Sequence, residues 1–253
     1  MIDKLVEQNR YELRSKQILD KSKVLKFKNP LNEMPIYLHS PYEKFIEIIN
    51  SYIDPSDYVL EIGAGKGEFT EFLIRTKANI IATDISTNSV KIVNTIFKDR
   101  NNLTAQVADM EYLPFEDKTF DVLICCGSLS YGDGKKIINE IQRVLKENGR
   151  LILVDSLNNN LIYSLNRYIH YIAGRRSISV IKRCPTIKFI EEIKDIFHYS
   201  ETFYFGKLSW IMPVVSKFTK DSKNISDNFD KFIKSDWPSF KFVLNASIKK
   251  SNE

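Results

Sequence analysis

Between Tyr58 and Ser156 the chain alternates short, almost continuously apolar runs with segments of helical spacing. The apolar runs are YVLEI (58–62), NIIAT (79–83), LTAQV (103–107), FDVLICC (120–126) and RLILVDS (150–156). Strands buried on both faces have this composition, and strands that alternate with helices at this spacing form a parallel sheet with right-handed crossovers. The alternation therefore predicts an open α/β sheet with helices on both faces.

Helical segments are predicted between these strands, over residues 68–76, 86–98 and 135–146. Ser86 is a typical N-cap residue, and Asn148-Gly149 is a typical helix stop. The chain divides into a helical extension (1–40), a core (41–156), and a cap with the final strands of the same domain (157–253). In the last part we expect helices over 158–173 and 185–197, strands over 201–206 and 240–248, and a polar insertion before the last strand.

Composition excludes several classes of protein. The sequence is 43% hydrophobic and contains no apolar run of the roughly 18 residues that a membrane span needs. The first ten residues lack the apolar stretch of a signal peptide, and three cysteines cannot form a disulfide framework. A net charge of +5 is too small to indicate nucleic-acid binding. We expect a cytoplasmic, reduced protein without a metal site.

Three of the nine glycines, Gly63, Gly65 and Gly67, lie within five positions after the first predicted strand. Glycine lets the backbone turn tightly and approach a ligand, and ligands bind at the carboxyl ends of the strands in open α/β sheets. A dinucleotide requires the spacing G-x-G-x-x-G, whereas Glu68 occupies the third required position here. Glu61, two residues before the first glycine, favours a cationic ligand over a diphosphate.

From about Pro41 to Ser156 the chain resembles the class I S-adenosylmethionine-dependent methyltransferases, in particular the methyltransferase type 11 group. The resemblance is carried by EIGAGKG (61–67), IIATDIS (80–86), VADMEYLPF (107–115) and RVLKENGRLILVD (143–155). It implies a doubly wound, mostly parallel seven-stranded, Rossmann-like α/β sheet with an antiparallel last strand. It also implies S-adenosylmethionine as cofactor and S-adenosylhomocysteine as product.

The same resemblance implies roles for individual residues. Asp84, with Ile85 beside it, would hold the ribose hydroxyls, Asp109 would meet the adenine amino group, and Met110 would pack on the ring. The end of the fourth strand, at Cys126, would complete the methionine pocket. The loop that would wrap the amino acid part contributes Glu61, Gly63, Ala64, Gly65 and Gly67. Alternatives remain open: Asp84 as a helix cap, Asp109 as a turn residue, and the cysteines as buried thiols.

The sequence constrains the identity of the methyl acceptor less than that of the cofactor. The Asn/Asp-Pro-Pro-aromatic motif of enzymes that methylate base nitrogens is missing after the fourth strand, which argues against nucleic acid. The segments 154–186 and 237–250 resemble a bacterial subgroup of glycan-biosynthesis methyltransferases, which implies a sugar-containing or anionic small molecule. Asn158, Tyr163 and Arg167 are the predicted substrate residues, because their spacing would place them on one helix face. A solvated basic face and peripheral contact with an anionic membrane are alternatives.

His170 and Tyr131 are the candidates for a catalytic role. Histidine can take a proton near neutral pH, and Tyr131 follows the predicted methyl-donor pocket. His39 and His198 are further candidates for a base. We expect residues 157–190 and 207–238 to fold over the carboxyl end of the sheet and wall the acceptor site, and the N-terminal segment to close the cofactor side. Rival functions are methylation of a lipid or quinone head group and a non-catalytic cofactor-binding scaffold. The oligomeric state is not predicted.

Overall fold

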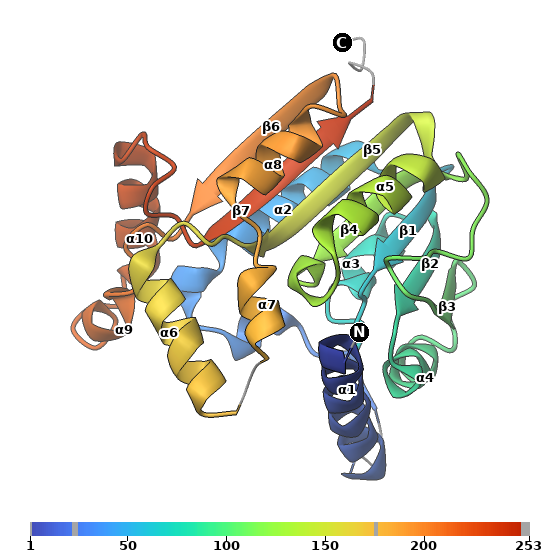
Figure 1. Cartoon of the computed structure of the whole chain (residues 1–253), viewed down its shortest axis with the longest axis horizontal. Helices are drawn as coiled ribbons and strands as arrows, with labels where there is room; N and C mark the ends of the chain where they lie inside the picture. The colour runs from blue at the N-terminus through green and yellow to red at the C-terminus, as the bar shows by residue number, and fades with distance from the viewer. Residues whose placement is uncertain (1, 22–24, 175–176, 249–253) are drawn as a thin grey trace.

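The computed structural model describes residues 2–21, 25–174 and 177–248 of the chain. A seven-stranded sheet runs through its centre in the order β3-β2-β1-β4-β5-β7-β6 (Figure 1). The strands are β1 (Tyr58–Ile62), β2 (Asn79–Asp84), β3 (Leu103–Val107), β4 (Phe120–Cys126), β5 (Leu145–Ser156), β6 (Tyr199–Phe205) and β7 (Lys241–Ser247). Strand β7 is antiparallel to both of its neighbours, and the other strand pairs are parallel. The predicted fold class is confirmed.

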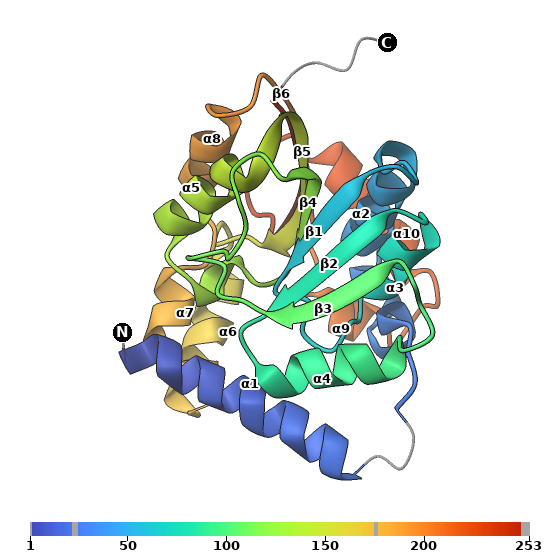
Figure 2. The same ribbon diagram turned by 90° about the vertical axis from the view of Figure 1, so that its right-hand side faces the viewer.

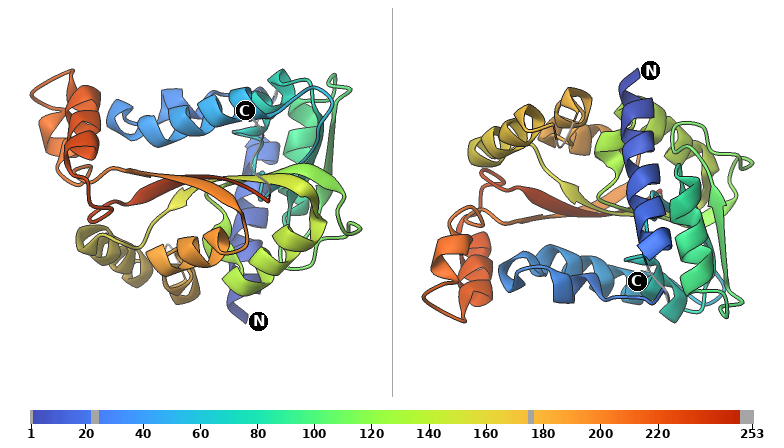
Figure 3. Two further views of the ribbon diagram at one scale, coloured as in Figure 1. Left: turned by 90° about the horizontal axis from the view of Figure 1, so that it is seen from above. Right: turned by 90° about the horizontal axis from the view of Figure 1, so that it is seen from below.

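Helices cover both faces of the sheet (Figure 3). The helices α2 (Ser40–Tyr52), α3 (Thr70–Arg75) and α4 (Thr87–Ile96) pack on one face through a cluster that includes Phe45, Leu73 and Val93. The helices α5 (Gly134–Val144) and α8 (Ile187–Lys194) pack on the other face, where Ile137 and Ile190 are fully buried. Because both faces are covered, the central strands are apolar on both sides, which explains their unbroken hydrophobic runs.

The remaining helices lie outside these two layers. Helix α1 (Ile2–Lys21) crosses the carboxyl end of the parallel strands next to α4, and α6 (Leu161–Ile172) and α7 (Ile178–Lys182) project from the same end (Figures 1 and 2). Helices α9 (Met212–Val215) and α10 (Ser222–Phe232) lie between β6 and β7 in the sequence. Short 3-10 turns cover 30–33, 36–38 and 129–131. Within the described residues, no helix is long and apolar enough to cross a membrane.

Several element boundaries differ from the sequence predictions, for local reasons. Helix α5 ends at Val144 and not at Asn148-Gly149, because Leu145 pairs with Phe120 and already belongs to β5. The helix predicted over 158–173 begins at Leu161, because the side chain of Asn160 accepts the amide protons of the first turn and acts as its N-cap. Helix α10 occupies part of the stretch expected as a polar insertion. The cap residues Arg175 and Arg176 lie outside the described residues.

Candidate functional site

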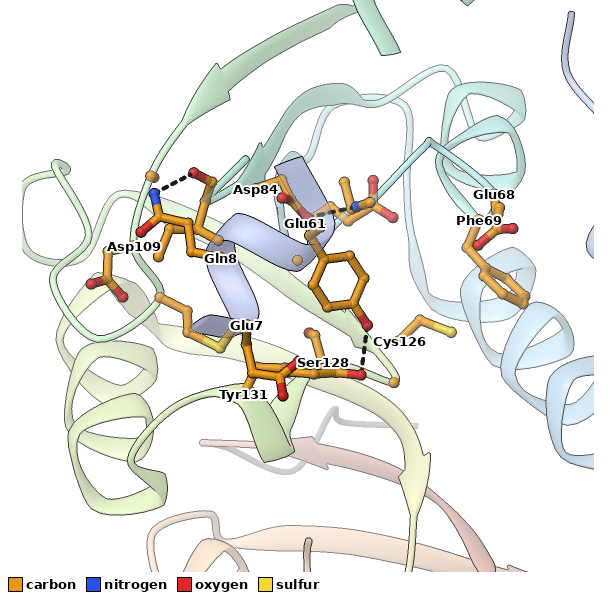
Figure 4. Close-up of a pocket in the computed structure, with 18 of the residues that line it drawn as sticks. Glu7, Gln8, Glu61, Glu68, Phe69, Asp84, Asp109, Cys126, Ser128 and Tyr131 are labelled. Atoms are coloured by element: carbon orange, nitrogen blue, oxygen red, sulfur yellow. Dashed lines mark hydrogen bonds between the residues drawn. The ribbon is translucent and has the colours of Figure 1, made fainter. Parts of the chain in front are cut away.

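A pocket of about 290 Å³ opens at the carboxyl end of the parallel strands (Figure 4). The loop after β1, the end of β2, the loop after β3 and the end of β4 form its floor, and α1 lies across it. This is the edge at which the side chains that follow successive parallel strands converge. Its lining residues are Lys4, Glu7, Gln8, Tyr11, Tyr42, Glu61, Gly63, Ala64, Gly65, Glu68, Phe69, Asp84, Ile85, Ala108, Asp109, Met110, Cys126, Gly127, Ser128 and Tyr131.

The loop after β1 requires glycine at its first position. Gly63 has a φ of +68°, and a Cβ there would lie 2.3 Å from the side-chain oxygen of Ser128. The amide of Ala64 donates a hydrogen bond to the carbonyl of Thr83, which ties the loop to β2. Backbone rather than side chain therefore faces the pocket at this point, and a ligand can approach it closely.

Glu61 is a buried carboxyl group at the base of the pocket. It is 2% exposed and accepts a hydrogen bond of 2.6 Å from the hydroxyl of Thr70. Burial raises its pKa to about 7, against the smaller opposing effect of the Thr70 hydrogen bond. An unpaired carboxylate costs free energy in such a place, and a bound cation would offset that cost.

Asp84 ends β2 and holds two backbone amides. Its Oδ2 accepts a hydrogen bond of 2.9 Å from the amide of Gly65, and its Oδ1 accepts one of 2.8 Å from the amide of Ser86. Burial raises its pKa. The N-cap of α4 is Ser86, as predicted, whose side chain accepts the amide proton of Ser89. Asp84 therefore fixes the glycine loop as well as lining the pocket.

Asp109 is engaged by α1. The ammonium group of Lys4 lies 2.7 and 2.6 Å from its two carboxylate oxygens and 3.1 Å from Glu111. Asp109 also accepts the amide proton of Glu111 at 2.9 Å, a local turn bond. Both the predicted pocket role and the turn role of Asp109 are thus compatible with its position.

Two of the residues that line the pocket are tyrosines in contact with each other, Tyr11 and Tyr131. The hydroxyl of Tyr11 donates a hydrogen bond of 2.5 Å to the hydroxyl of Tyr131, and the two rings meet edge to face with centroids 5.1 Å apart. Burial raises the pKa of Tyr11. Since the oxygen of Tyr131 accepts this bond, its own proton is available to another acceptor. Burial also raises the pKa of Cys126 well above its usual value, which argues against a thiolate nucleophile.

The structure brings together in this pocket all of the predicted cofactor residues except Gly67. Gly67 lies behind the loop, where its φ is +82° and a Cβ would come within 2.8 Å of the Phe97 ring. The role of Gly67 is therefore close packing against α4. Tyr131, one of the two catalytic candidates, also lines the pocket.

The predicted substrate residues lie elsewhere and are bonded within the cap. Arg167 is 8% exposed and donates hydrogen bonds to the carbonyl of Leu157 and the side chain of Asn158. Tyr163 donates to Ser209 and stacks on a phenylalanine ring. Asn158 precedes α6 and does not lie on its face. As far as the described chain goes, the cap folds at the carboxyl end as expected, but no residue after Tyr131 lines this pocket.

None of the histidines lines the pocket either. His170 lies half-buried in the last turn of α6. A ring nitrogen of His39 lies 3.1 Å from the carbonyl oxygen of Met34, and His198 is exposed just before β6, at the amino end of that strand. Of the two residues predicted to have a catalytic role, Tyr131 therefore lines the pocket and His170 does not.

The N-terminal segment lies over the pocket, as expected, but the individual residues of α1 that line it were not predicted from the sequence. The polar side of this helix lines the pocket through Lys4, Glu7, Gln8 and Tyr11. Its apolar residues Leu5, Val6 and Leu13 are 43–61% exposed. These polar residues follow one another at three- and four-residue steps, so a polar stripe was visible in the sequence. Tyr42, Phe69 and Ser128 were also missed, and no motif marks them.

The lining suits a cationic ligand rich in hydroxyl groups. Five carboxyl groups and one ammonium group line the pocket, and no arginine does. Glu68 also lines the pocket and lies 3.0 Å from Lys66. Its carboxylate is negatively charged and would repel a pyrophosphate. The residues present fit S-adenosylmethionine, which carries a sulfonium, an ammonium and two ribose hydroxyls. Within the described part of the chain, no cluster of three or more His, Cys, Asp or Glu side chains could hold a metal ion.

Several known proteins resemble this chain in sequence and in fold. A family model described as a methyltransferase domain matches residues 60–153. The uncharacterised protein MJ0638 of Methanocaldococcus jannaschii is 32% identical over 72% of this chain and 81% of its own. The uncharacterised methyltransferase YcgJ of Bacillus subtilis is 32% identical over 62% of this chain and 61% of its own. The ubiquinone/menaquinone biosynthesis C-methyltransferase UbiE of Teredinibacter turnerae is 32% identical over 47% and 50%.

Solved structures show the same fold at lower identity. The crystal structure of YcgJ from Bacillus subtilis has a TM-score of 0.56 at 21% identity and covers 85% of this chain and 100% of its own. Geranyl diphosphate C-methyltransferase from Streptomyces coelicolor, solved with S-adenosylhomocysteine, has a TM-score of 0.56 at 16% identity, with coverages of 83% and 80%. Against some curated relatives the chain matches only half to three fifths of their length.

Proposed function

The chain belongs to the class I S-adenosylmethionine-dependent methyltransferases, and we propose that it transfers a methyl group from this cofactor to a small-molecule acceptor. The observation that carries the proposal is the convergence of Glu61, Asp84 and Asp109 with the glycine loop on one pocket. Fold neighbours solved with S-adenosylhomocysteine support the choice of cofactor. No sequence motif for another activity competes with this one.

The residues of the pocket divide into binding and orienting groups. When bound, the cofactor supplies a methyl group on a positively charged sulfur. Glu61 and Asp84 would hold the cationic and hydroxyl-bearing parts, and Asp109 and Met110 the adenine. The free proton of Tyr131 would orient the acceptor, with Tyr11 fixing its ring. The α1 helix would exclude water from the reacting atoms, which favours displacement at the methyl group.

The acceptor proposed from the sequence is a sugar or nucleotide-sugar, methylated at oxygen or nitrogen, from surface polysaccharide synthesis. Its support is the resemblance of the cap sequence, since Asn158, Tyr163 and Arg167 do not line the pocket. A lipid or quinone head group is the second candidate. The exposed apolar face of α6 favours it, and so does the relative named as a quinone C-methyltransferase.

Calorimetry and a methyl-transfer assay test the proposal separately. The purified protein should bind S-adenosylhomocysteine and show no response to NAD. Incubation with labelled S-adenosylmethionine and either nucleotide sugars or short-chain quinones, followed by mass spectrometry, should identify the methylated class. Binding of NAD without binding of S-adenosylhomocysteine would overturn the cofactor. Cofactor binding without transfer to any acceptor would favour the scaffold function.

A further inference from the structure

Helix α6 turns its apolar side away from the protein. Seven of its twelve residues are large apolar or aromatic side chains that are at least 38% exposed, and Leu161, Leu165 and Ile172 reach 79%, 63% and 74%. The full set is Leu161, Ile162, Leu165, Tyr168, Ile169, Tyr171 and Ile172. These positions recur at three- and four-residue steps and so form one stripe along the helix. A large outward apolar stripe on one helix indicates an interaction surface.

The polar side of α6 is fixed inward by specific bonds. Arg167 is buried and reaches the carbonyl of Leu157, and Tyr163 stacks on Phe240 with ring centroids 4.4 Å apart. Asn160 caps the helix and donates to the carbonyl of Pro238 at 2.6 Å. The helix cannot roll its apolar side onto the core without breaking these bonds. The exposed stripe is therefore a stable property of the fold.

The segment of the chain that carries this stripe is basic. From 156 to 190 the chain contains no aspartate or glutamate. Within the described part of that range, Lys182 is exposed and Arg183 half-exposed at the end of α7, the helix that packs beside α6. Lys188 is also exposed, although it lies 3.9 Å from Glu192. The segment that carries the apolar stripe thus contributes cations and no carboxylate of its own, which suits an anionic surface.

Helix α1, which contacts the cap, likewise turns polar side chains inward and apolar side chains outward. Glu7 accepts the amide proton of Ser177, just before α7, and Glu12 bonds to the hydroxyl of Ser86, so both carboxylates face inward. Leu5 and Val6 are exposed beside Glu7. Trp210, which follows the Ser209 that Tyr163 binds, is 43% exposed, and tryptophan is enriched at membrane interfaces. More than one element at this end of the molecule thus presents apolar side chains outward.

We propose that the outward stripe of α6 docks into the surface of a lipid bilayer that carries anionic head groups. A twelve-residue helix is about 18 Å long, which is too short to cross a bilayer but suited to lie in its interface. A second copy of the chain fits less well, because a symmetric interface would bring the cations of residues 156–190 close to their own counterparts. The inference goes beyond the methyl-transfer proposal and does not depend on it.

Vesicle sedimentation with the full chain tests the proposal. The protein should sediment with vesicles of phosphatidylcholine and phosphatidylglycerol, bind vesicles of phosphatidylcholine alone at least tenfold more weakly, and be released by high salt. Leu165→Glu and Ile169→Glu should each weaken binding more than tenfold. Lys182→Ala should weaken it about fivefold, the effect expected for one cation near an anionic surface.

Val107→Glu is the matched control, because Val107 is 49% exposed at the opposite edge of the sheet, on β3. This variant should bind vesicles like the wild type. S-adenosylhomocysteine binding by each α6 variant, measured by calorimetry, verifies folding and keeps the test separate from the function proposal. Absence of vesicle binding, or binding that Leu165→Glu and Val107→Glu weaken equally, would overturn the proposal. So would a lipid-free dimer that Leu165→Glu dissociates, since a second copy would then cover the stripe.

Discussion

The ammonium group of Lys4 lies 2.7 and 2.6 Å from the two carboxylate oxygens of Asp109, and both residues line the pocket. Asp109 is the residue expected to bind the adenine amino group, so the ammonium group of Lys4 and the ligand would compete for the same carboxylate. Lys4 also reaches Glu111 at 3.1 Å, which gives α1 a second electrostatic contact with the loop after β3. The N-terminal extension is therefore coupled to the pocket by charge.

Lys4→Met should tighten S-adenosylhomocysteine binding by up to about fivefold, because the ligand no longer competes with an ion pair worth about 0.2–1 kcal/mol. The gain should shrink at high salt, since both side chains are partly exposed. Calorimetry at low and high ionic strength measures both effects. Weaker binding by the variant would instead assign Lys4 to holding the ligand.

Asp84 should contribute to folding as well as to binding. Asp84→Ala leaves the amides of Gly65 and Ser86 without their acceptor, so we expect it to lower the free energy of unfolding by about 1–3 kcal/mol. The same variant should also lose the ribose contacts, which we expect to cost roughly 2–4 kcal/mol of cofactor binding. Urea unfolding and calorimetry separate the two losses. An unchanged unfolding free energy would contradict the loop-fixing role.

The sheet could be predicted from the sequence because each core strand is apolar along its whole length, and the glycine loop marked where the pocket opens. The orientation of the covering helices could not. Periodicity shows that a helix has two faces but not which face the protein covers. Helix α1 buries Glu7, helix α6 buries Arg167, and both helices expose leucines. Asn158 was misplaced because Asn160, two residues later, caps the helix.

Glu61 predicts a pH dependence of ligand binding. Burial raises its pKa to about 7, so at pH 6 most ligand-free molecules hold it protonated. A cationic ligand favours the ionised form, so affinity for S-adenosylhomocysteine, through its ammonium group, should rise between pH 6 and pH 8. Below pH 7 the rise is at most about tenfold per pH unit. Calorimetry over this range measures it, and a flat profile would contradict it.

The same shift gives the ligand-free protein a stability that falls with pH. The pKa of Glu61 is higher in the folded than in the unfolded chain, so the folded state binds more protons between pH 4.5 and about 7. The free energy of unfolding contributed by this group should fall through that window, by up to about 3 kcal/mol. Glu61→Gln, which is neutral at every pH, should remove this component. Parallel urea-unfolding profiles for variant and wild type would exclude it.

Substitutions at Tyr131 and His170 should have different effects on turnover in a methyl-transfer assay. Tyr131→Phe should lower turnover by about 10- to 100-fold and change S-adenosylhomocysteine affinity less than twofold, because the lost proton orients the acceptor. His170→Ala should leave turnover within about twofold, since His170 does not line the pocket, which reverses the sequence-based expectation. Turnover per folded molecule is the measurement. A large loss in His170→Ala with Tyr131→Phe unaffected would restore the histidine as the base.

Arg167 should act on stability and not on acceptor binding. Its guanidinium group is buried and holds the carbonyl of Leu157 and the side chain of Asn158, which fixes the chain between β5 and α6. Arg167→Ala leaves that carbonyl unpaired and removes packed methylene groups, so we expect the free energy of unfolding to fall by about 1–3 kcal/mol. Asn166→Ala, an exposed neighbour on the same helix, should change it by less than about 0.5 kcal/mol. The KM for the acceptor should stay constant in both variants. A raised KM in Arg167→Ala at unchanged stability would return Arg167 to the substrate role that its spacing first suggested.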